Sequence, residues 1–392
     1  MKYREFGKTG IQVSALGFGA MRLPVVAVDP QDPKSEKVVD EKEAVAIIRR
    51  AIRKGVNYVD TAYGYHGGHS ERIVGLALQD GWREKTYLAT KFPCWQWKKS
   101  GDFGRILNTQ LKRLQTDHVD FYMFHAVGAQ SWNDVILKQG LLEKMLKARK
   151  AGKIRHIGFS FHDSLEVFKS IVDYTDIWDF CQIQINYLDT EHQAGLAGLR
   201  YAHAKGLAVI AMEPLKGGTL ANLPQEAAKV FEGTARSPVE WGLDFLWNMP
   251  EVSMLLSGMG TRQMVDDNVQ YAGRSKPGML APADTAIIAQ ARQAMQGVDS
   301  IPCTACEYCL PCPFGVAIPY NFRAFNNLSK GRTKAECKTQ YDTWVTMFGK
   351  RADACVGCRA CEPRCPQLIV ISERMKEVAA TFKRIRAKKI EA

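Results

Sequence analysis

Up to about residue 270, short runs of β-branched and aromatic residues alternate with longer stretches of helical periodicity. Residues 41–55 show the helical type, since Val45 and Ile48 belong to a set of apolar positions at helical spacing. Residues 194–206 are a second example and end in a glycine suited to a helix C-cap. The predicted strands are ALGFGAM (15–21), NYVDTA (57–62), TYLATKF (86–92), VDFYMFH (119–125), IRHIGFS (154–160), DFCQIQIN (179–186), LAVIAMEP (207–214) and SMLLSGM (253–259).

The alternation of strand and helix predicts parallel strands joined by right-handed crossovers. Eight such repeats are the number that closes a (β/α)8, or TIM, barrel. A doubly wound open sheet is the alternative, but the first strand is not followed by the G-x-G-x-x-G turn of dinucleotide-binding sheets. The opening YREFGKTGIQV (3–13) predicts an N-terminal hairpin that covers one end of the barrel. We therefore predict an α/β fold of the TIM-barrel type.

The pattern changes after about residue 275. SKPGMLAPAD is rich in proline and glycine, as connections are, and the strand signal disappears beyond it. Helical stretches then separate two runs of cysteines. We predict a barrel over residues 1–275, a linker over 276–284 and a C-terminal, mainly α-helical domain over 285–392.

Eight of the eleven cysteines lie in two short runs, CTACEYCLPCP (303–313) and CVGCRACEPRCP (355–366). Three cysteines at C-x2-C-x2-C spacing converge on one face of a [4Fe–4S] cube, and the fourth, before a proline, ligates the other cluster in two-cluster proteins. The predicted ligands are Cys303, Cys306, Cys309 and Cys365 for one cluster and Cys355, Cys358, Cys361 and Cys312 for the other. The first run has one residue fewer before its last cysteine, so Cys312 departs from the common bacterial spacing.

Zinc is the alternative for these cysteines, because four-cysteine zinc sites also use paired C-x2-C turns. Two zinc sites would not need triplets followed by a further Cys-Pro, so iron–sulfur clusters are favoured. The module resembles a two-[4Fe–4S] ferredoxin domain, and its long interval between the runs resembles the all-helical version in succinate dehydrogenase iron–sulfur subunits. The lone cysteines Cys94, Cys181 and Cys337 are interpreted as small buried hydrophobic residues.

The composition is that of a globular protein, with 46% hydrophobic and 24% charged residues. No stretch is apolar enough for a membrane helix, and the start MKYREFGKTG lacks the apolar core of a signal peptide, so we expect a cytoplasmic protein without disulfides. The net charge of +12 is spread along the chain, apart from KRIRAKK (383–389), and cluster thiolates offset part of it. We interpret it as a solvated basic surface and expect no nucleic-acid or membrane partner.

Three consecutive predicted strands end in ionisable residues, namely Asp60, Lys91 and His125. Catalytic residues of a (β/α)8 barrel lie at this end of the strands. Tyr65 follows on the same loop as Asp60. Because a tyrosine is a poor acid near neutral pH unless a cation lowers its pKa, Lys91 would supply that cation, Asp60 would orient Lys91, and His125 would direct a substrate oxygen. Each residue alone has a structural explanation, but the set predicts a general-acid site.

The motifs DTAYGY, ATKF and FH occur in the order and spacing of the aldo-keto reductase superfamily, which the sequence resembles over residues 3–272. The resemblance implies that Tyr65 protonates a carbonyl oxygen while NADP(H) or NAD(H) carries the hydride. It also implies an extended nicotinamide cofactor across the barrel mouth and a small aldehyde, ketone or alcohol as the substrate.

The resemblance also implies cofactor contacts. The segment GKIRHIGFSFH matches the family's GxSN segment and places Ser160 near the nicotinamide carboxamide, with Phe161 where asparagine is usual. The segment CQIQINYLD matches the family's Q-x3-N segment. It selects Gln182 as a second carboxamide partner, with Gln184 as the rival.

Two later segments complete the implied cofactor site. VIAMEPLKGG contributes Met212 and Leu215, and Met212 stands where many members have an aromatic residue that stacks on the nicotinamide. SGMGTRQMVDDN contributes Gly258, Arg262 and Asn268 but lacks the Lys and Arg that usually bind a 2′-phosphate. Arg262 either substitutes for them or faces solvent, so the choice between NADPH and NADH stays open.

Two further pairs of residues near these motifs have competing interpretations. Trp95 and Trp97 follow Lys91 and either wall an apolar substrate pocket or pack within their loop. His66 and His69 lie in a Gly-rich loop with no further ligand candidates, and we interpret them as structural rather than metal-binding.

The two halves of the chain raise a question of electron transfer. A nicotinamide transfers electrons in pairs, a [4Fe–4S] cluster takes one at a time, and the sequence has no flavin fingerprint to connect them. The leading prediction is an aldo-keto-reductase-type enzyme whose clusters serve an external redox protein or act as a redox sensor. The alternatives are an iron–sulfur electron-transfer protein with the barrel as a scaffold, and a nicotinamide-sensing regulatory subunit. The intact set of Asp60, Tyr65, Lys91 and His125 favours the enzyme.

Overall fold

The computed structural model describes residues 1–32, 35 and 37–385. These residues divide into two compact units. The first comprises residues 1–28, 37–214 and 242–281, and the second comprises residues 215–241 and 282–385 together with 29–32 and 35. Residues 215–241, which the sequence pattern joins to the barrel, are therefore grouped with the cysteine-containing part of the chain.

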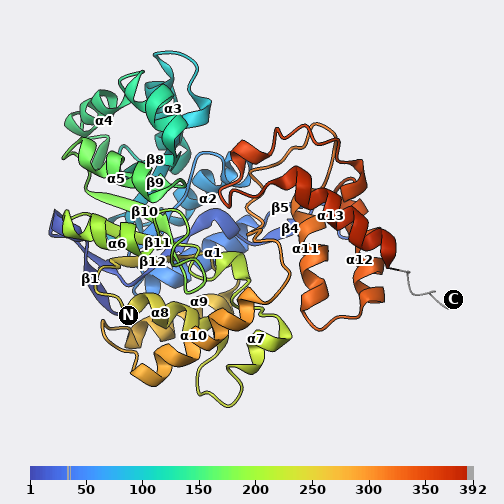
Figure 1. Ribbon diagram of the computed structural model, residues 1–392. Helices are drawn as coiled ribbons and strands as arrows, with labels where there is room; N and C mark the ends of the chain where they lie inside the picture. Colours follow the sequence, from blue (N-terminus) through green and yellow to red (C-terminus); the bar gives the residue numbers. More distant parts are fainter. Residues whose placement is uncertain (33–34, 36, 386–392) are drawn as a thin grey trace. The chain divides into compact units, whose positions relative to one another are not determined.

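The first unit is a closed barrel of parallel strands, which confirms the predicted fold (Figure 1). The strand order around the barrel is β10, β11, β12, β3, β6, β7, β8 and β9. Each strand overlaps one of the predicted runs. The strands are β3 (Leu16–Gly19), β6 (Tyr58–Asp60), β7 (Tyr87–Pro93), β8 (Val119–Val127), β9 (Ile154–Phe161), β10 (Phe180–Gln184), β11 (Ala208–Met212) and β12 (Met254–Ser257).

The predicted N-terminal hairpin closes the amino-terminal end of the barrel. Strands β1 (Tyr3–Glu5) and β2 (Gln12–Ser14) pair antiparallel. Phe6, between them, is fully buried, with its ring centroid 4.7 Å from that of Phe121 and 5.7 Å from that of Phe180. Since Phe121 and Phe180 lie near the starts of β8 and β10, this aromatic layer fills the end of the barrel opposite the predicted catalytic residues.

Helices alternate with the strands of the barrel, and each turns an apolar stripe inward. In α1, for example, the Asp40 side chain caps the first turn by accepting from the Glu43 amide, and Ile47 and Ile48 are fully buried. The helices are α1 (Glu41–Arg53), α2 (His69–Ala77), α3 (Asp102–Leu114), the π-helical segment η6 (Ser131–Leu137), α4 (Leu141–Lys150), α5 (Leu165–Tyr174), α6 (Gly195–Ala204) and α9 (Arg262–Arg274). Helix α8 (Pro238–Trp247) crosses from the second unit into the first.

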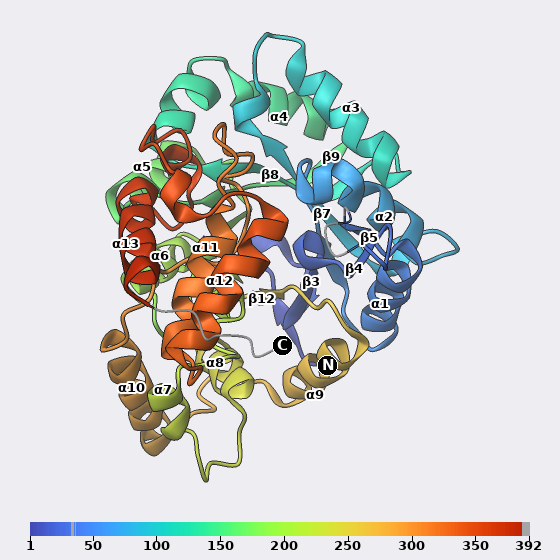
Figure 2. The ribbon, with the colours of Figure 1, turned by 90° about the vertical axis from the view of Figure 1, so that its right-hand side faces the viewer.

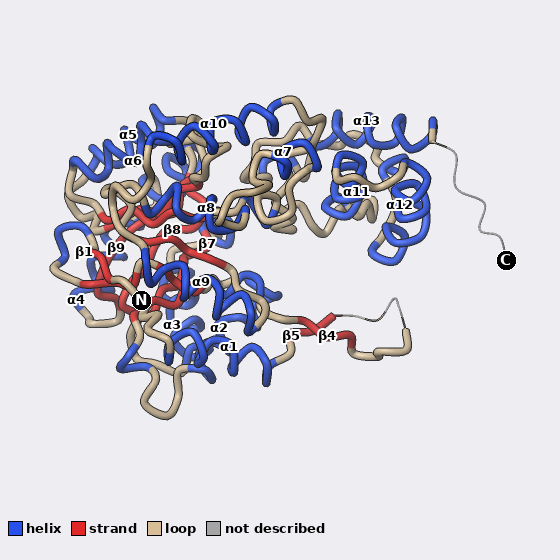
Figure 3. Tube along the Cα trace, turned by 90° about the horizontal axis from the view of Figure 1, so that it is seen from below, coloured by secondary structure: helices blue, strands red, loops and turns tan. Residues whose placement is uncertain are grey.

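A small two-stranded sheet interrupts the chain between β3 and α1. Strand β4 (Val25–Ala27) pairs antiparallel with β5 (Lys37–Val39), away from the barrel sheet (Figure 3). The sequence pattern did not predict this pair, because two runs of three residues are too short to show strand periodicity.

The second unit is helical, as predicted. Its helices are α7 (Gln225–Lys229), α10 (Pro282–Gln296), α11 (Ile318–Asn326), α12 (Lys334–Phe348) and α13 (Ile371–Arg384). Helix α11 packs against both α12 and α13 (Figure 2). Helix α12 begins with a capping box in which Thr333 and Glu336 satisfy each other's backbone amides. Of the basic segment 383–389, residues 386–389 lie outside the described residues.

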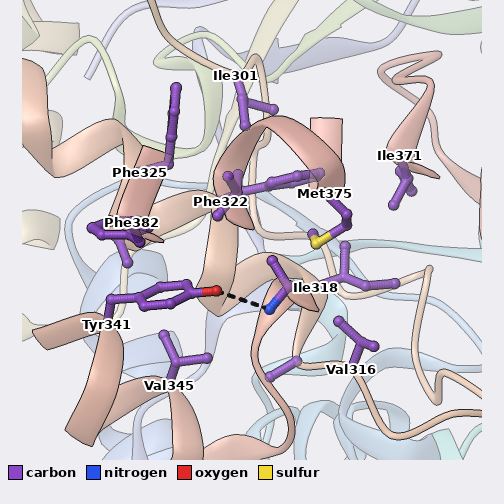
Figure 4. Packing of buried hydrophobic residues seen from close by; sticks show 14 of the residues in the cluster. Ile301, Val316, Ile318, Phe322, Phe325, Tyr341, Val345, Ile371, Met375 and Phe382 are labelled. Carbon is purple, nitrogen blue, oxygen red and sulfur yellow. Dashed lines mark hydrogen bonds between the residues drawn. The ribbon is translucent and has the colours of Figure 1, made fainter. Parts of the chain in front are cut away.

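The helical unit has its own core of buried hydrophobic residues (Figure 4). Tyr341 stacks on Phe382 with ring centroids 4.0 Å apart, and its hydroxyl accepts a hydrogen bond of 3.1 Å from the Ala352 amide. Cys309 belongs to this core, and five other cysteines pack against it. The cysteine loops therefore pack against the hydrophobic core that the helices form. No helix among the described residues is long and apolar enough to cross a membrane.

Candidate active site and cysteine module

The structure brings Asp60, Lys91, Tyr65 and His125 together at the carboxyl end of the barrel. The Lys91 ammonium contacts Asp60 Oδ1 and donates hydrogen bonds to the Thr61 carbonyl at 2.8 Å and to the Tyr65 hydroxyl at 3.3 Å. The ring of His125 lies edge-on to that of Tyr65, with centroids 5.8 Å apart. Each side chain comes from the end of its strand or from the loop that follows, which explains why residues so far apart in sequence meet.

Burial dominates the electrostatics of this group. Lys91 and Asp60 are each 1% exposed. Burial lowers the pKa of Lys91, and the charge of Asp60 opposes that shift. Burial raises the pKa of Asp60, and Lys91 opposes that shift in turn. Burial and the nearby charge of Lys91 hold the pKa of His125 well below its ordinary value, so His125 is neutral and can donate one hydrogen bond.

Ser160 and Gln182 occupy one level of the barrel interior, because they are direct partners in the β9–β10 register. Both are 2% exposed, and the Ser160 hydroxyl accepts a hydrogen bond of 2.8 Å from the Ala126 amide. The Gln182 side-chain oxygen is buried and accepts no hydrogen bond from the described residues. Gln184, two residues further along, donates to Asp189 at 2.8 Å. Register therefore places Gln182, rather than Gln184, beside Ser160, with a buried acceptor that suits a carboxamide NH2.

Arg262 has a partner that neither sequence interpretation foresaw. It forms a bidentate ion pair with Glu43, with N–O distances of 2.9 and 2.7 Å, while its side chain stays 59% exposed to solvent. Asn268 donates to the Ser257 hydroxyl at 3.3 Å. A Cβ added at Gly258 would lie 3.3 Å from the side chain of Arg22, which brings a different arginine against the loop after β12.

The other residues singled out from the sequence are placed as follows. Met212 ends β11, and its carbonyl accepts from the Ile185 amide at 3.2 Å, whereas Leu215 belongs to the second unit. Trp95 is 54% exposed and has its ring 5.0 Å from that of His125. The nitrogen Nε2 of His66 accepts from the Leu23 amide at 3.2 Å, which is a structural contact.

Cysteines of the two runs lie close enough to interact electrostatically. Burial raises the pKa of Cys309, and the sulfurs that add to the shift are those of Cys306, Cys303, Cys365 and Cys361. Burial also raises the pKa of Cys361 to about 11, and the contributing sulfurs there are Cys312 and Cys355. Cys365 thus lies near Cys309 of the first triplet and Cys312 lies near Cys361 of the second, although Cys361 also interacts with Cys309. The crossed ligation stays a prediction. Cys94, Cys181 and Cys337 are free and buried, as interpreted from the sequence.

The two cysteine runs share one backbone conformation. Helix α11 begins six residues after Cys312, and α13 begins six residues after Cys365. Three matched pairs of positions adopt positive φ, which L-residues adopt rarely and which makes the runs an internal repeat. The pairs are Ala305 and Gly357 (52° and 73°), Glu307 and Arg359 (65° and 59°), and Gly315 and Leu368 (76° and 54°). The extra residue of the second run lies in the short 3-10 helix Glu362–Arg364.

The cysteine sulfurs also receive backbone hydrogen bonds. The Ala305 amide donates to Cys303 Sγ at 3.4 Å, and the amides of Gln367, Leu368 and Ile369 lower the pKa of Cys365 by hydrogen bonding against the larger effect of burial. Amide donors of this kind stabilise cluster thiolates. No three His, Cys, Asp or Glu side chains within residues 1–32, 35 and 37–385 close around a single metal ion. A cubane holds each cysteine on a separate iron, so its ligands lie farther apart, and this donor set fits it.

Sequence reasoning missed a layer of buried polar residues behind the active site. Thr61, Thr90, Glu71 and Gln110 are each fully buried. The sequence signal was limited to Glu71 at the start of the helical stretch ERIVGLALQ, which is apolar from Ile73 to Leu78.

The closed barrel of parallel strands carries a buried Lys91–Asp60 pair beside Tyr65. The chain belongs to the aldo/keto reductase family, whose model matches residues 15–277. The model of the 4Fe-4S dicluster domain matches residues 302–371, so the chain joins both domains.

Individual relatives resemble the barrel. L-galactose dehydrogenase from Arabidopsis thaliana is 29% identical over 69% of this chain and 87% of its own length. Aldo-keto reductase YhdN from Bacillus subtilis is 33% identical over 44% of this chain and 51% of its own length. Among solved structures, the holo form of aldo-keto reductase AKR11C1 from Bacillus halodurans has a TM-score of 0.61 at 24% identity, covering 74% of this chain and 96% of its own. An aldo/keto reductase from Klebsiella pneumoniae in complex with NADP and acetate has a TM-score of 0.59 at 21% identity, covering 76% of this chain and 97% of its own.

Proposed function

We propose that the barrel interconverts a small aldehyde or ketone and its alcohol with a nicotinamide cofactor. NADPH or NADH, when bound, supplies a hydride to the carbonyl carbon. Tyr65 donates its proton to the carbonyl oxygen, so that the C=O bond becomes CH–OH. Lys91 stabilises the negative charge that develops on the Tyr65 oxygen, Asp60 holds Lys91, and neutral His125 orients the carbonyl by hydrogen bonding. The contact of one buried ammonium with both Asp60 and Tyr65 carries this proposal.

The cofactor contacts follow from the same family. Ser160 and Gln182 would hold the nicotinamide carboxamide, with Met212 along the cofactor and Gly258 and Asn268 at its far end. Because Arg262 is paired with Glu43, we expect it to contribute less to a 2′-phosphate than a free arginine would. The Klebsiella pneumoniae protein binds NADP, and NADP(H) is accordingly our first choice over NAD(H).

The test is cofactor oxidation with simple aldehydes. Tyr65→Phe should lower kcat by at least about a hundredfold, since positioned proton transfer contributes factors of that order. Tyr174→Phe removes the hydroxyl of a tyrosine that is 56% exposed and should leave turnover unchanged. Equal turnover of the parent and Tyr65→Phe would contradict the proposal.

We propose further that the dicluster domain holds two [4Fe–4S] clusters and exchanges electrons with an external redox protein. The asymmetry of the internal repeat supports this. Val356 in the second run is 61% exposed, whereas Thr304 at the matching position of the first run is 2% exposed. Cys358 is exposed, and the adjacent Arg359 side chain is 65% exposed. An exposed apolar residue and a basic side chain at the cluster edge suit an acidic electron carrier.

Anaerobic purification, iron and sulfide analysis and visible spectroscopy test this second role. Bleaching of the clusters by NADPH or NADH would mean that the two halves exchange electrons. Clusters that dithionite reduces and NADPH does not, alongside aldehyde turnover, would mean that the clusters serve a separate partner or a sensory role. Absence of iron from the purified protein would contradict the proposal. The cytoplasmic location of the protein is a separate prediction.

A further inference from the structure

A second buried carboxylate, Glu71, lies behind Lys91 and takes no part in the chemistry proposed above. It is in the first turn of α2, and its side chain is fully buried. Its Oε1 accepts hydrogen bonds from the Thr90 hydroxyl at 2.7 Å and from the Gln110 amide at 2.7 Å, and its Oε2 accepts from Arg113 at 3.1 Å. A buried carboxylate is tolerated only when it is paired and hydrogen-bonded, and Glu71 meets both conditions.

One branch of this network ends on the strand of Lys91. The Gln110 amide that donates to Glu71 also lies 3.0 Å from the Lys91 carbonyl oxygen and 3.1 Å from the Thr90 hydroxyl. Gln110 is itself oriented by the Tyr122 hydroxyl, which donates to its oxygen at 2.7 Å. Thr90 and Lys91 are consecutive in β7. Glu71 is therefore hydrogen-bonded directly to Thr90 and, through Gln110, to the Lys91 carbonyl.

The other branch ends on the loop of Tyr65. Arg113 donates to the Tyr63 carbonyl at 3.1 Å, and its guanidinium lies 4.5 Å from the centroid of the Tyr63 ring. On the other side of that loop, a Cβ at Gly68 would stand 3.0–3.2 Å from the guanidinium nitrogens and carbon of Arg113, a close approach that glycine permits. Arg113 is therefore hydrogen-bonded before Tyr65, at Tyr63, and lies close to the backbone after it, at Gly68.

We propose that Glu71 is a positioning residue that fixes the Tyr65 loop and the Lys91 strand relative to each other. The inference rests on the proposed carbonyl chemistry. Glu71 touches neither the substrate nor the reacting atoms, and it acts through Gln110, Thr90 and Arg113.

The electrostatics of Lys91 agree with this role. Burial lowers the pKa of Lys91, Asp60 opposes the shift most strongly, and the charge of Glu71 opposes it further. The other ionisable groups that face Lys91 are Tyr65 from the adjacent loop and His125, which is neutral, from β8. If the charge of Glu71 is removed, Lys91 keeps only Asp60 as a counter-ion and loses its proton at a lower pH.

The test is the pH profile of kcat for Glu71→Gln, which keeps the size of the side chain and removes its charge. We expect the alkaline limb of this profile, where kcat falls as the pH rises, to shift to a pH that is lower by about half to one unit. At a given pH on that limb, kcat should then be about three- to tenfold lower than that of the parent. Glu71→Asp should keep the parent limb. Glu41→Gln is the matched control, because Glu41 is an exposed carboxylate that pairs with Arg72, the neighbour of Glu71 in α2. It should leave the profile unchanged.

The outcomes separate this inference from the proposed function. An alkaline limb of Glu71→Gln that coincides with that of the parent overturns it. If thermal unfolding shows that Glu71→Gln does not fold, Thr90→Val replaces it. That variant keeps the charge and removes the hydrogen bonds of the Thr90 hydroxyl with Glu71 and Gln110, so kcat should fall while the limb stays in place, and a parent-like kcat overturns the inference. If the parent itself turns over no aldehyde, the proposed function fails, and this inference falls with it.

Discussion

Gly217 lies directly against the backbone of Thr304. A Cβ at Gly217 would stand 2.5 Å from the Thr304 carbonyl oxygen, and φ of Gly217 is +63°. Thr304 is the first residue after Cys303, so the segment 216–218 supports the first C-x2-C turn of the cysteine module. This contact helps to explain why residues 215–241 group with the helical unit, which contains both Gly217 and Thr304.

Gly217→Ala should therefore displace the first cysteine turn. We expect the variant to lose about half of the bound iron, since one of two equal clusters depends on this turn. Gly218→Ala is the matched control, because its φ of +93° imposes similar backbone strain but a Cβ there meets nothing within 4 Å. Iron and sulfide analysis of both proteins checks the prediction. Equal iron losses would assign the effect to backbone strain instead of contact with Thr304.

The crossed ligation makes a second prediction. Cys312→Ser should remove the same cluster as Cys355→Ser, although Cys312 lies in the first run, because Cys312 and Cys355 both neighbour Cys361. The two variants should give matching EPR spectra of the remaining cluster and retain about half of the iron. Cys337→Ser, at a lone buried cysteine, should retain all of it. A Cys312→Ser spectrum that matches that of Cys303→Ser would refute the crossed pairing.

Asp60→Asn should destabilise the fold as well as abolish turnover. It leaves Lys91 buried without its counter-ion, and removal of one partner of a buried pair costs about 3–5 kcal/mol. Denaturant unfolding at neutral pH measures the change in the free energy of unfolding. Asp80→Asn removes the exposed partner of Arg49, where Asp80 is 76% exposed, and should cost no more than about 1 kcal/mol. Equal effects of the two substitutions would be inconsistent with a charged buried pair.

His162 predicts a pH dependence of stability. Burial lowers its pKa to about 4, whereas the unfolded chain has an ordinary histidine pKa near 6.5. Between those values the unfolded chain binds a proton that the folded chain does not, so stability falls as the pH drops from about 6.5 to about 4. Because the ring keeps partial exposure, we expect the loss to be about 2 kcal/mol.

Unfolding titrations of the parent and of His162→Gln over this pH range provide the measurement. The variant should lose less stability than the parent as the solution is acidified. His203→Gln, at an exposed position on α6, should follow the parent curve. Parallel curves for the parent and His162→Gln would show that another group sets the acid sensitivity.

Short elements and side-chain partners were the least predictable features. The pair β4–β5 left no periodic signal, and the ion pair of Arg262 joins it to Glu43 across a large separation in sequence. The family's spacing selected Gln182 but left Gln184 as a rival. The strand register sets Gln182, and not Gln184, opposite Ser160, which favours Gln182.

The chain's local patterns by themselves determined the barrel and the helical C-terminal domain, and they selected the candidate residues of both sites. Strand–helix alternation specifies parallel strands, and the ends of those strands are where barrel enzymes carry catalytic residues. The C-x2-C-x2-C spacing of the cysteines indicates iron–sulfur ligands. Only the tertiary structure decided what surrounds those residues. The network that joins Glu71, Gln110 and Arg113 to Lys91 and Tyr65 depends on how α2 and α3 pack on β7. Such contacts follow from the packing of distant segments, which no local spacing encodes.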